Sequence, residues 1–275
     1  MTFDGAGIRG RVRACLASML VALAVAFLAV RPARADLVVP SGSLTSIGPG
    51  VIDLACTDVV VSGTLQVNSG QLSNVRSVTI NPGGAIDGGS GLIEVGGNWT
   101  NSGSFIAGTG TVNFRDLCSF GNAVVMGSTT FYRASFVSAS GKNYVFAIDS
   151  TQTVTALLEI AGTAPQPIQF RSSNPGQTAF INLLTGGTQQ IQHVGVTDVW
   201  ATGQWLAPFL TNEGGSGNAQ RWFGVPDGGG GGGAAAAIPA LDGTALFSLA
   251  ALLAAMGAWS LRRRGVTRPA RTNGE

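Results

Sequence analysis

Short runs of apolar and polar residues, separated by glycine-rich turns, fill the chain from residue 36 to residue 227. Runs of Val, Ile, Thr and Phe bounded by Gly, Asn and Ser are typical of β-strands. Apolar residues are not kept at helical spacing anywhere in this region, so the pattern predicts no helix in it. The expected strands are residues 59–61, 64–67, 77–80, 92–95, 111–114, 144–148 and 168–170.

A loose repeat organises these strands. Similar units begin at Gly63, Gly84 and Gly103, which are 21 and 19 residues apart. A period of about 20 residues predicts an all-β fold, a right-handed parallel β-helix or solenoid, whose stacked rungs bury one another's apolar side chains. We expect glycine at the corners because it adopts a positive φ without steric cost. The alternative is a β-sandwich, which also uses short strands.

Residues 1–35 have the three parts of a secretory signal peptide. Three arginines precede an uncharged run over residues 14–30, and Ala33 and Ala35 form a small-x-small site before Asp36. This order predicts an N-terminal signal helix that enters the Sec translocon and is removed by signal peptidase after Ala35. An uncleaved N-terminal anchor is the alternative.

A second apolar segment lies near the other end. Residues 243–261 carry no charge, and a helix of 19 residues spans roughly 28 Å, about the hydrocarbon thickness of a bilayer. Arg262, Arg263 and Arg264 follow, and such clusters stay on the cytoplasmic side of the inner membrane. The pattern predicts a C-terminal transmembrane helix, residues 265–275 as a basic cytoplasmic tail, and everything upstream outside. A buried core helix is the alternative.

A short motif stands just before this segment and reads Ile238, Pro239, Ala240 and Leu241. The order of motif, helix and arginine cluster over residues 238–264 resembles the sorting domain of IPTL-CTERM proteins, a branch of the PEP-CTERM signals of Gram-negative bacteria. Ala240 stands where that motif usually has threonine. The resemblance implies recognition by an exosortase-type transpeptidase and transfer to the cell envelope or surface. Residues 228–237, all glycine and alanine, predict a flexible linker that keeps the motif accessible.

The body between these ends, residues 36–227, resembles known surface proteins in places. Residues 97–105, 108–114 and 128–132 are similar to segments of large bacterial surface proteins, which implies a β-helical, adhesin-like body. The region from residue 180 to residue 223 is similar to the final rungs of such solenoids. Its aromatic residues are expected to cover the last rung, and a carbohydrate platform is the alternative; they include Trp200, Trp205 and Trp222.

Composition excludes several classes of function. Only 11% of the residues are charged, and the chain has one lysine, one histidine and three cysteines. The body carries 11 acidic and 6 basic residues, a formal charge of −5, so a basic surface for nucleic acid is not expected. The scarcity of His and Cys argues against a zinc site, and we expect neither a metal nor a cofactor.

Catalysis has little support in the residue pattern. A polysaccharide hydrolase needs two carboxylates about 5–10 Å apart, for which Asp87 with Glu94 or Asp53 with Asp58 are the candidates. Spaced acids in a turn-rich chain are usually solvated. His193 has neither a second histidine nor a serine in an elbow motif near it, which disfavours a triad. The expectation is a protein that is not an enzyme.

Two cysteines stay with the exported body. In an oxidising compartment Cys56 and Cys118 are expected to pair. They are 62 residues apart, about three rungs, so equivalent positions would lie roughly 14 Å apart, whereas a bridge needs Cα atoms within about 7 Å. Either one cysteine lies in a folded-back segment or the two thiols stay apart, and the sequence leaves this open.

These features together predict an exported, membrane-anchored protein of the cell envelope or surface, with a structural or adhesive role. A glycan or another envelope polymer is the expected external partner. The alternative is a surface-held β-helix protein that binds carbohydrate or cleaves polysaccharide.

Overall fold

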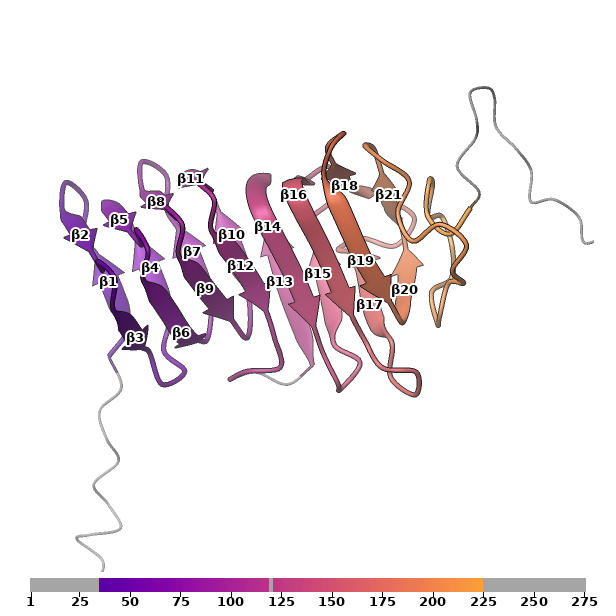
Figure 1. The fold of residues 1–275 in the computed structure, drawn as a ribbon, viewed down its shortest axis with the longest axis horizontal. Coiled ribbons are helices and arrows are strands. Elements are labelled where there is room, and N and C mark those ends of the chain that lie inside the picture. The colour runs from indigo at the N-terminus through magenta and orange to yellow at the C-terminus, as the bar shows by residue number, and fades with distance from the viewer. Residues whose placement is uncertain (1–34, 119–120, 225–275) are drawn as a thin grey trace, which may run out of the picture. The chain divides into compact units, whose positions relative to one another are not determined.

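The computed structural model describes residues 35–118 and 121–224, and all regular elements in them are β-strands (Figure 1). The strands are β1 (Leu37–Val39), β2 (Leu44–Ser46), β3 (Val51–Asp53), β4 (Val59–Val61), β5 (Thr64–Gln66), β6 (Gln71–Val75), β7 (Val78–Ile80), β8 (Ala85–Asp87), β9 (Leu92–Val95), β10 (Trp99–Asn101), β11 (Ser104–Ile106), β12 (Thr111–Phe114), β13 (Asn122–Met126), β14 (Thr129–Val137), β15 (Asn143–Phe146), β16 (Thr151–Ala161), β17 (Ile168–Ser172), β18 (Ala179–Leu183), β19 (Thr188–Gln192), β20 (Val194–Thr197) and β21 (Val199–Ala201).

The strands form three sheets with parallel ladders throughout. Sheet A contains β1, β4, β7, β10, β13, β15, β17 and β20 in spatial order, and sheet B contains β2, β5, β8 and β11. Sheet C runs from β3 through β6, β9, β12, β14, β16 and β18 to β21, with β19 beside β16. In the first rungs, consecutive strands enter different sheets, so each circuit adds one strand to all three (Figure 1). The parallel solenoid is therefore confirmed, and the β-sandwich, built from antiparallel sheets, is excluded.

The repeat seen in the sequence corresponds to sheet B. Thr64 pairs with Ala85, and Ala85 pairs with Ser104, so the units that begin at Gly63, Gly84 and Gly103 stack on one another. The strands expected at residues 59–61, 92–95 and 111–114 have the predicted bounds, and the other four differ by at most two residues at an end.

The reason given for the corner glycines needs correction. Neither Gly84 nor Gly103 has a φ in the left-handed region. A Cβ on Gly84 would instead overlap the carbonyl oxygen of Val61, and a Cβ on Gly103 would overlap the carbonyl oxygen of Gly84. Glycine is required at these corners because the backbones of neighbouring rungs approach closely, and not because of an unusual dihedral angle.

Inward-facing side chains form one continuous core whose composition changes along the stack. The first rungs are filled by aliphatic residues such as Val59, Leu65 and Ile86. From β10 onward the core is largely aromatic: the ring of Trp99 meets that of Phe105 edge-on at 5.1 Å between centroids. The other core rings of this region are Phe114, Phe131, Phe136, Tyr144, Phe146, Phe170 and Trp222.

The shape of the rungs changes with the core. Sheet B ends at β11, and the longer strands β14 and β16 follow. The ladder between them shifts register between Phe131 and Arg133. The first half of β16 then pairs with β18, and its second half pairs with β19. A long, bent strand thus replaces two short strands and the corner between them.

The two ends of the described stack differ. On β2 and β3 the side chains of Leu44 and Val51 are each 66% exposed. At the other end, residues 203–224 cross the last rung, and Trp222, only 4% exposed, packs edge-on against Phe170. This segment covers the last rung with aromatic and aliphatic side chains, as the capping interpretation predicts.

Candidate functional site

The two cysteines of the body form a disulfide bond, with Cα atoms 5.1 Å apart. Cys56 lies in the turn before β4, whereas Cys118 ends a segment, residues 115–118, that leaves β12 and folds back over earlier rungs. The Sγ of Cys118 lies 3.5 Å from the carbonyl oxygen of Asn74. Counting rungs overestimates the separation because the two residues do not occupy equivalent positions, and the folded-back alternative is the one observed.

Lys142 holds this folded-back segment in place from inside. Its side chain is buried, and its Nζ donates hydrogen bonds to the carbonyl oxygens of Gly96 and, at 3.0 Å, of Arg115. Burial lowers the pKa of the Lys142 ammonium, and the nearby carboxylate of Asp116 opposes this effect. The only lysine of the chain therefore has a structural environment.

Asp116 fixes the same segment to the following rungs. Its Oδ2 accepts hydrogen bonds from Ser138 Oγ at 2.9 Å and from the backbone N–H groups of Ala139 at 2.9 Å and Ser140 at 3.1 Å. These bonds satisfy the turn between β14 and β15. Asp116 thus acts as a turn cap in this structure.

The acid pair on the middle rungs is divided between two sheets. Asp87 ends β8 in sheet B, where its Oδ1 accepts a hydrogen bond from the backbone N–H of Gly89 at 3.1 Å. Glu94 lies on β9 in sheet C, where its carboxylate binds Arg115 at 3.0 Å and Gln71 at 3.1 Å. Each carboxylate is therefore held by its own neighbours.

The other acid pair is bound in a similar way. Arg76 donates hydrogen bonds to the carboxylate of Asp58, which lowers the pKa of that group. The pKa of Asp53 is lowered by a hydrogen bond from the backbone N–H of Ala55 and by another from Asn74. Both environments favour the ionised form, which suits a stable carboxylate better than a proton donor.

His193 lies in the turn between β19 and β20, with a φ of 51°. Its Nδ1 is 3.1 Å from a carboxylate oxygen of Glu213, and both side chains are about one third exposed. The residue is a hydrogen-bonded surface histidine, as the sequence pattern favours.

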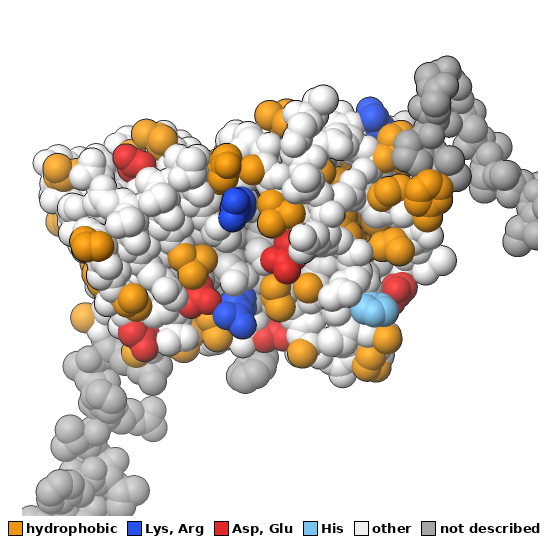
Figure 2. Space-filling view, viewed as in Figure 1, with side chains coloured by type: hydrophobic (Ala, Val, Ile, Leu, Met, Phe, Trp, Pro, Cys, Tyr) orange, Lys and Arg blue, Asp and Glu red, His pale blue; other side chains and the backbone are white. Residues whose placement is uncertain are grey.

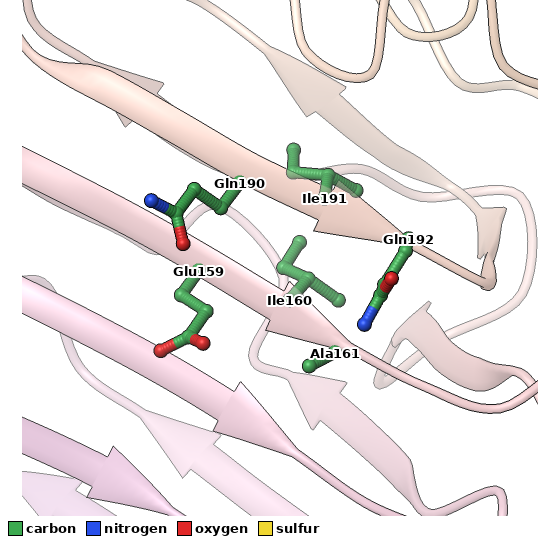
Figure 3. Close-up of a pocket in the computed structure, with 6 residues that line it drawn as sticks. All are labelled: Glu159, Ile160, Ala161, Gln190, Ile191 and Gln192. Atoms are coloured by element: carbon green, nitrogen blue, oxygen red, sulfur yellow. The ribbon is translucent and has the colours of Figure 1, made fainter.

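The outer face of sheet C contains a shallow groove. Seen from the same side as Figure 1, the few charged side chains gather around the middle of this face (Figure 2). The groove has a volume of about 260 Å³ and lies between β16 and β19, where Glu159 faces Gln190 on the neighbouring strand (Figure 3). Glu159 accepts a hydrogen bond of 2.6 Å from Ser135. The groove offers polar groups to a ligand but no aromatic ring.

A second hollow lies at the C-terminal end of the stack, with a volume of about 390 Å³. It lies where the turn after β18, strand β19 and the capping segment meet. Its walls combine a guanidinium group, two amide side chains, a hydroxyl group, an indole ring and a proline; the residues are Thr185, Gln189, Gln204, Trp205, Pro208 and Arg221. This mixture of groups can bind an anionic, hydroxyl-rich ligand.

Sequence reasoning named only part of this second hollow. Trp205 stood out as an aromatic residue of the last rungs, whereas Gln204 and Thr185 are ordinary residues in polar turns. A usable signal was Arg221, one of only six basic residues of the body, inside a capping segment that otherwise consists of apolar and small polar residues.

The residues predicted to direct export are only partly described. Ala35 and Asp36 are exposed at the start of the described chain, and Asp36 accepts a hydrogen bond from the backbone N–H of Asp58 at 3.0 Å. The remaining residues of these predictions lie outside the described residues: Ala33, Ile238, Pro239, Ala240, Leu241, Arg262, Arg263 and Arg264.

Two searches of residues 35–118 and 121–224 gave negative results. In those ranges no three His, Cys, Asp or Glu side chains gather as a metal site, and no helix is long and apolar enough to cross a membrane. Comparisons of the chain with protein-family models, with curated proteins and with solved structures found no match.

Proposed function

We propose that this chain is an exported, envelope-anchored solenoid with a structural or adhesive role and without catalytic activity. The observation that carries the proposal is the disulfide bond between Cys56 and Cys118. Disulfide bonds persist in oxidising compartments such as the periplasm and the cell surface, and they are rare in the cytosol. The oxidised pair therefore agrees with the signal peptide expected at residues 1–35.

The environments of the candidate acids support a non-catalytic role. A glycosidase acid must hold its proton near neutral pH, which requires a raised pKa. The pKa of Asp58 is lowered by Arg76, and that of Asp53 is lowered by Ala55 and Asn74. These groups are suited to hold turns and rungs together.

The remaining parts of the proposal rest on the sequence. The first 35 residues would bring the chain to the Sec translocon, and signal peptidase would cut after Ala35. Residues 238–264 would hold the chain in the inner membrane until an exosortase-type enzyme acts at the motif that begins at Ile238. The body would wind right-handed, as parallel β–crossover–β connections almost always do.

Fractionation of cells that express the chain tests its export. An epitope inserted at Gly42, in an exposed turn, should be found with the envelope, on a chain whose two body cysteines resist alkylation until they are reduced. A matched chain without residues 1–35 should stay in the cytosol with thiols that react at once. Full-length protein in the cytosol with two free thiols would contradict the proposal.

A second comparison tests the sorting motif separately. Alanine at Ile238, Pro239 and Leu241 should leave the transmembrane segment intact but abolish removal of the tail. The same three substitutions within the linker at residues 228–237 should have no effect on processing. Equal processing of both variants would show that the motif is not read.

A further inference from the structure

We propose that the hollow at the C-terminal end of the solenoid binds a saccharide that carries carboxylate groups. The proposal deepens the adhesive role proposed above and rests on it for the place where the ligand is met. Its evidence is independent, since it comes from the side chains that line the hollow.

Arg221 supplies the positive charge. Its side chain is exposed, and within the described residues no carboxylate forms an ion pair with it, whereas Arg76 and Arg115 have acidic partners. Its backbone has a φ of 61°, and its carbonyl oxygen accepts a hydrogen bond of 3.0 Å from Leu206. The residue is thus anchored by its main chain while its guanidinium group stays available. A guanidinium group binds a carboxylate through two parallel hydrogen bonds.

Gln204 supplies an acceptor in a fixed position. Its Nε2 donates to the carbonyl oxygens of Leu184 at 2.6 Å and Gly187 at 2.8 Å. These two bonds orient the amide, whose Oε1 has no hydrogen-bond partner among the residues described. Thr185, on an exposed turn, adds a hydroxyl group. Fixed acceptors and hydroxyl groups of this kind suit the hydroxyl groups of a sugar.

Trp205 supplies an apolar surface. A Cβ on Gly224 would overlap the six-membered ring of Trp205, so the chain passes close to the indole and holds it. Gln189 fixes the backbone on either side, since its Nε2 donates to the Trp205 carbonyl oxygen at 2.7 Å and its Oε1 accepts from the Ala207 N–H at 2.8 Å. A held ring with a partly exposed surface can stack against the C–H face of a sugar.

The neighbouring backbone is unusual for a simple cap. Ala207, Phe209, Arg221 and Phe223 all have positive φ values between 49° and 65°, although none is glycine. Phe209 is 75% exposed, directly after Pro208 at the edge of the hollow. Strained backbone of this kind concentrates at sites where side chains must be presented in fixed positions.

The groove over β16 and β19 is the weaker candidate for the same ligand. Its charged residue is Glu159, which would repel an acidic sugar, and its other lining residues offer amide and aliphatic groups. Arg221 and Trp205 therefore favour the C-terminal hollow.

Calorimetric titration of the full chain in detergent micelles tests the proposal. The acidic probe is tetragalacturonate, and the matched neutral probe is β-1,4-galactotetraose, which lacks the carboxylates. We expect the acidic probe to bind more tightly, and Arg221→Gln to weaken its binding about tenfold, because a hydrogen-bonded charge pair is lost. Binding of the neutral probe should change little.

Two further variants keep the result interpretable. Arg133→Gln removes the same charge from β14 and should leave binding unchanged. Thr185→Asp places a negative charge on the exposed turn beside the hollow and should weaken acidic binding without unfolding the chain, which near-ultraviolet circular dichroism checks.

The outcomes separate this inference from the proposed function. If the wild-type chain binds neither probe, or if Arg133→Gln weakens binding as much as Arg221→Gln, the inference is wrong and the export proposal still stands. If binding follows the predicted pattern but fractionation finds the chain in the cytosol, the inference about the site is kept and the surface role is lost.

Discussion

The first rungs and the later rungs of this solenoid solve the same packing problem with different side chains. In sheet A, Leu37 pairs with Val59, Val59 with Val78 and Val78 with Trp99, so the register advances by 22, 19 and 21 residues. The next step, from Trp99 to Val125, takes 26 residues. The steps lengthen where the core changes from aliphatic to aromatic. A larger ring in the core needs a longer circuit around it.

The corners change along with the circuits. The early rungs turn between short strands where glycine allows the close approach of backbones, as at Gly84. From β14 onward the chain passes the same place in a long strand with a register shift between Phe131 and Arg133. Aromatic volume has thus removed one sheet and left a bent strand, which indicates that the side chains of a rung determine its outline.

The disulfide bond and its supporting contacts join these two regions. Cys118 lies after β12 and bonds back to Cys56 before β4, while Lys142 and Asp116 fix the segment between them to the later rungs. The aliphatic region buries less surface per side chain than the aromatic one. A covalent bond is therefore most useful there, because it restricts the unfolded chain.

Phe136→Ala should have the largest effect, because Phe136 stacks on Phe114 at 4.7 Å and packs against Tyr144 and Phe170. We expect a loss of about 4 kcal/mol in the free energy of unfolding, measured by urea titration. Hydrogen exchange should show that β12 to β17 lose protection first.

Leu65→Ala is the matched change in the aliphatic region, since Leu65 is equally buried. We expect a loss of about 3 kcal/mol, with exchange spreading from β4 to β8. If both variants lose protection in the same strands, the two regions are one cooperative unit and the comparison fails.

Removal of the disulfide bond by Cys56→Ala and Cys118→Ala should cost about 3 kcal/mol, because a closed loop of 62 residues is opened in the unfolded state. Urea titration of the oxidised protein, the reduced protein and the double variant measures this. Reduction should destabilise the wild type to the level of the variant and leave the variant unchanged. Equal stability of all three would show that the bond does not contribute.

Lys142→Met should cost about 2 kcal/mol, since the carbonyl groups of Gly96 and Arg115 lose a donor while the cost of burying a charge is removed. Because the folded-state pKa of Lys142 is lowered, the unfolded state binds more protons between that pKa and about 10.5, and wild-type stability rises with pH in this window. The difference between wild type and variant should therefore grow as the pH is raised through this window. A constant difference would contradict the assignment.

Arg76→Gln should have the smallest effect, below about 1 kcal/mol, because the Arg76–Asp58 pair is largely exposed. The lowered pKa of Asp58 stabilises the fold above the unfolded pKa of about 4, and this contribution is lost as the pH falls through the lower folded value. The variant and the wild type should converge in acid, which urea titration at several pH values measures. A difference that persists in acid would point to packing.

The sequence predicted the early rungs well because their information is local. Alternating residues and corner glycines repeat at nearly constant spacing there, and the strand ends at residues 92–95 and 111–114 follow directly. The long strands β14 and β16 were missed because a corner that straightens into a bend leaves no turn signal.

The disulfide bond and the C-terminal hollow could not be predicted because both depend on contacts that are distant in sequence. Cys118 approaches Cys56 only because residues 115–118 reverse along the stack. Arg221 and Thr185 meet only after the cap crosses the last rung. Neither approach has a periodic pattern in the chain.

The intact mass of the protein, isolated from the cell envelope, tests the central claim most directly. The account predicts a chain that begins at Asp36 and is lighter than its reduced form by two hydrogen atoms. A chain that retains Met1, recovered from the cytosol with a mass unchanged by reductant, would contradict it.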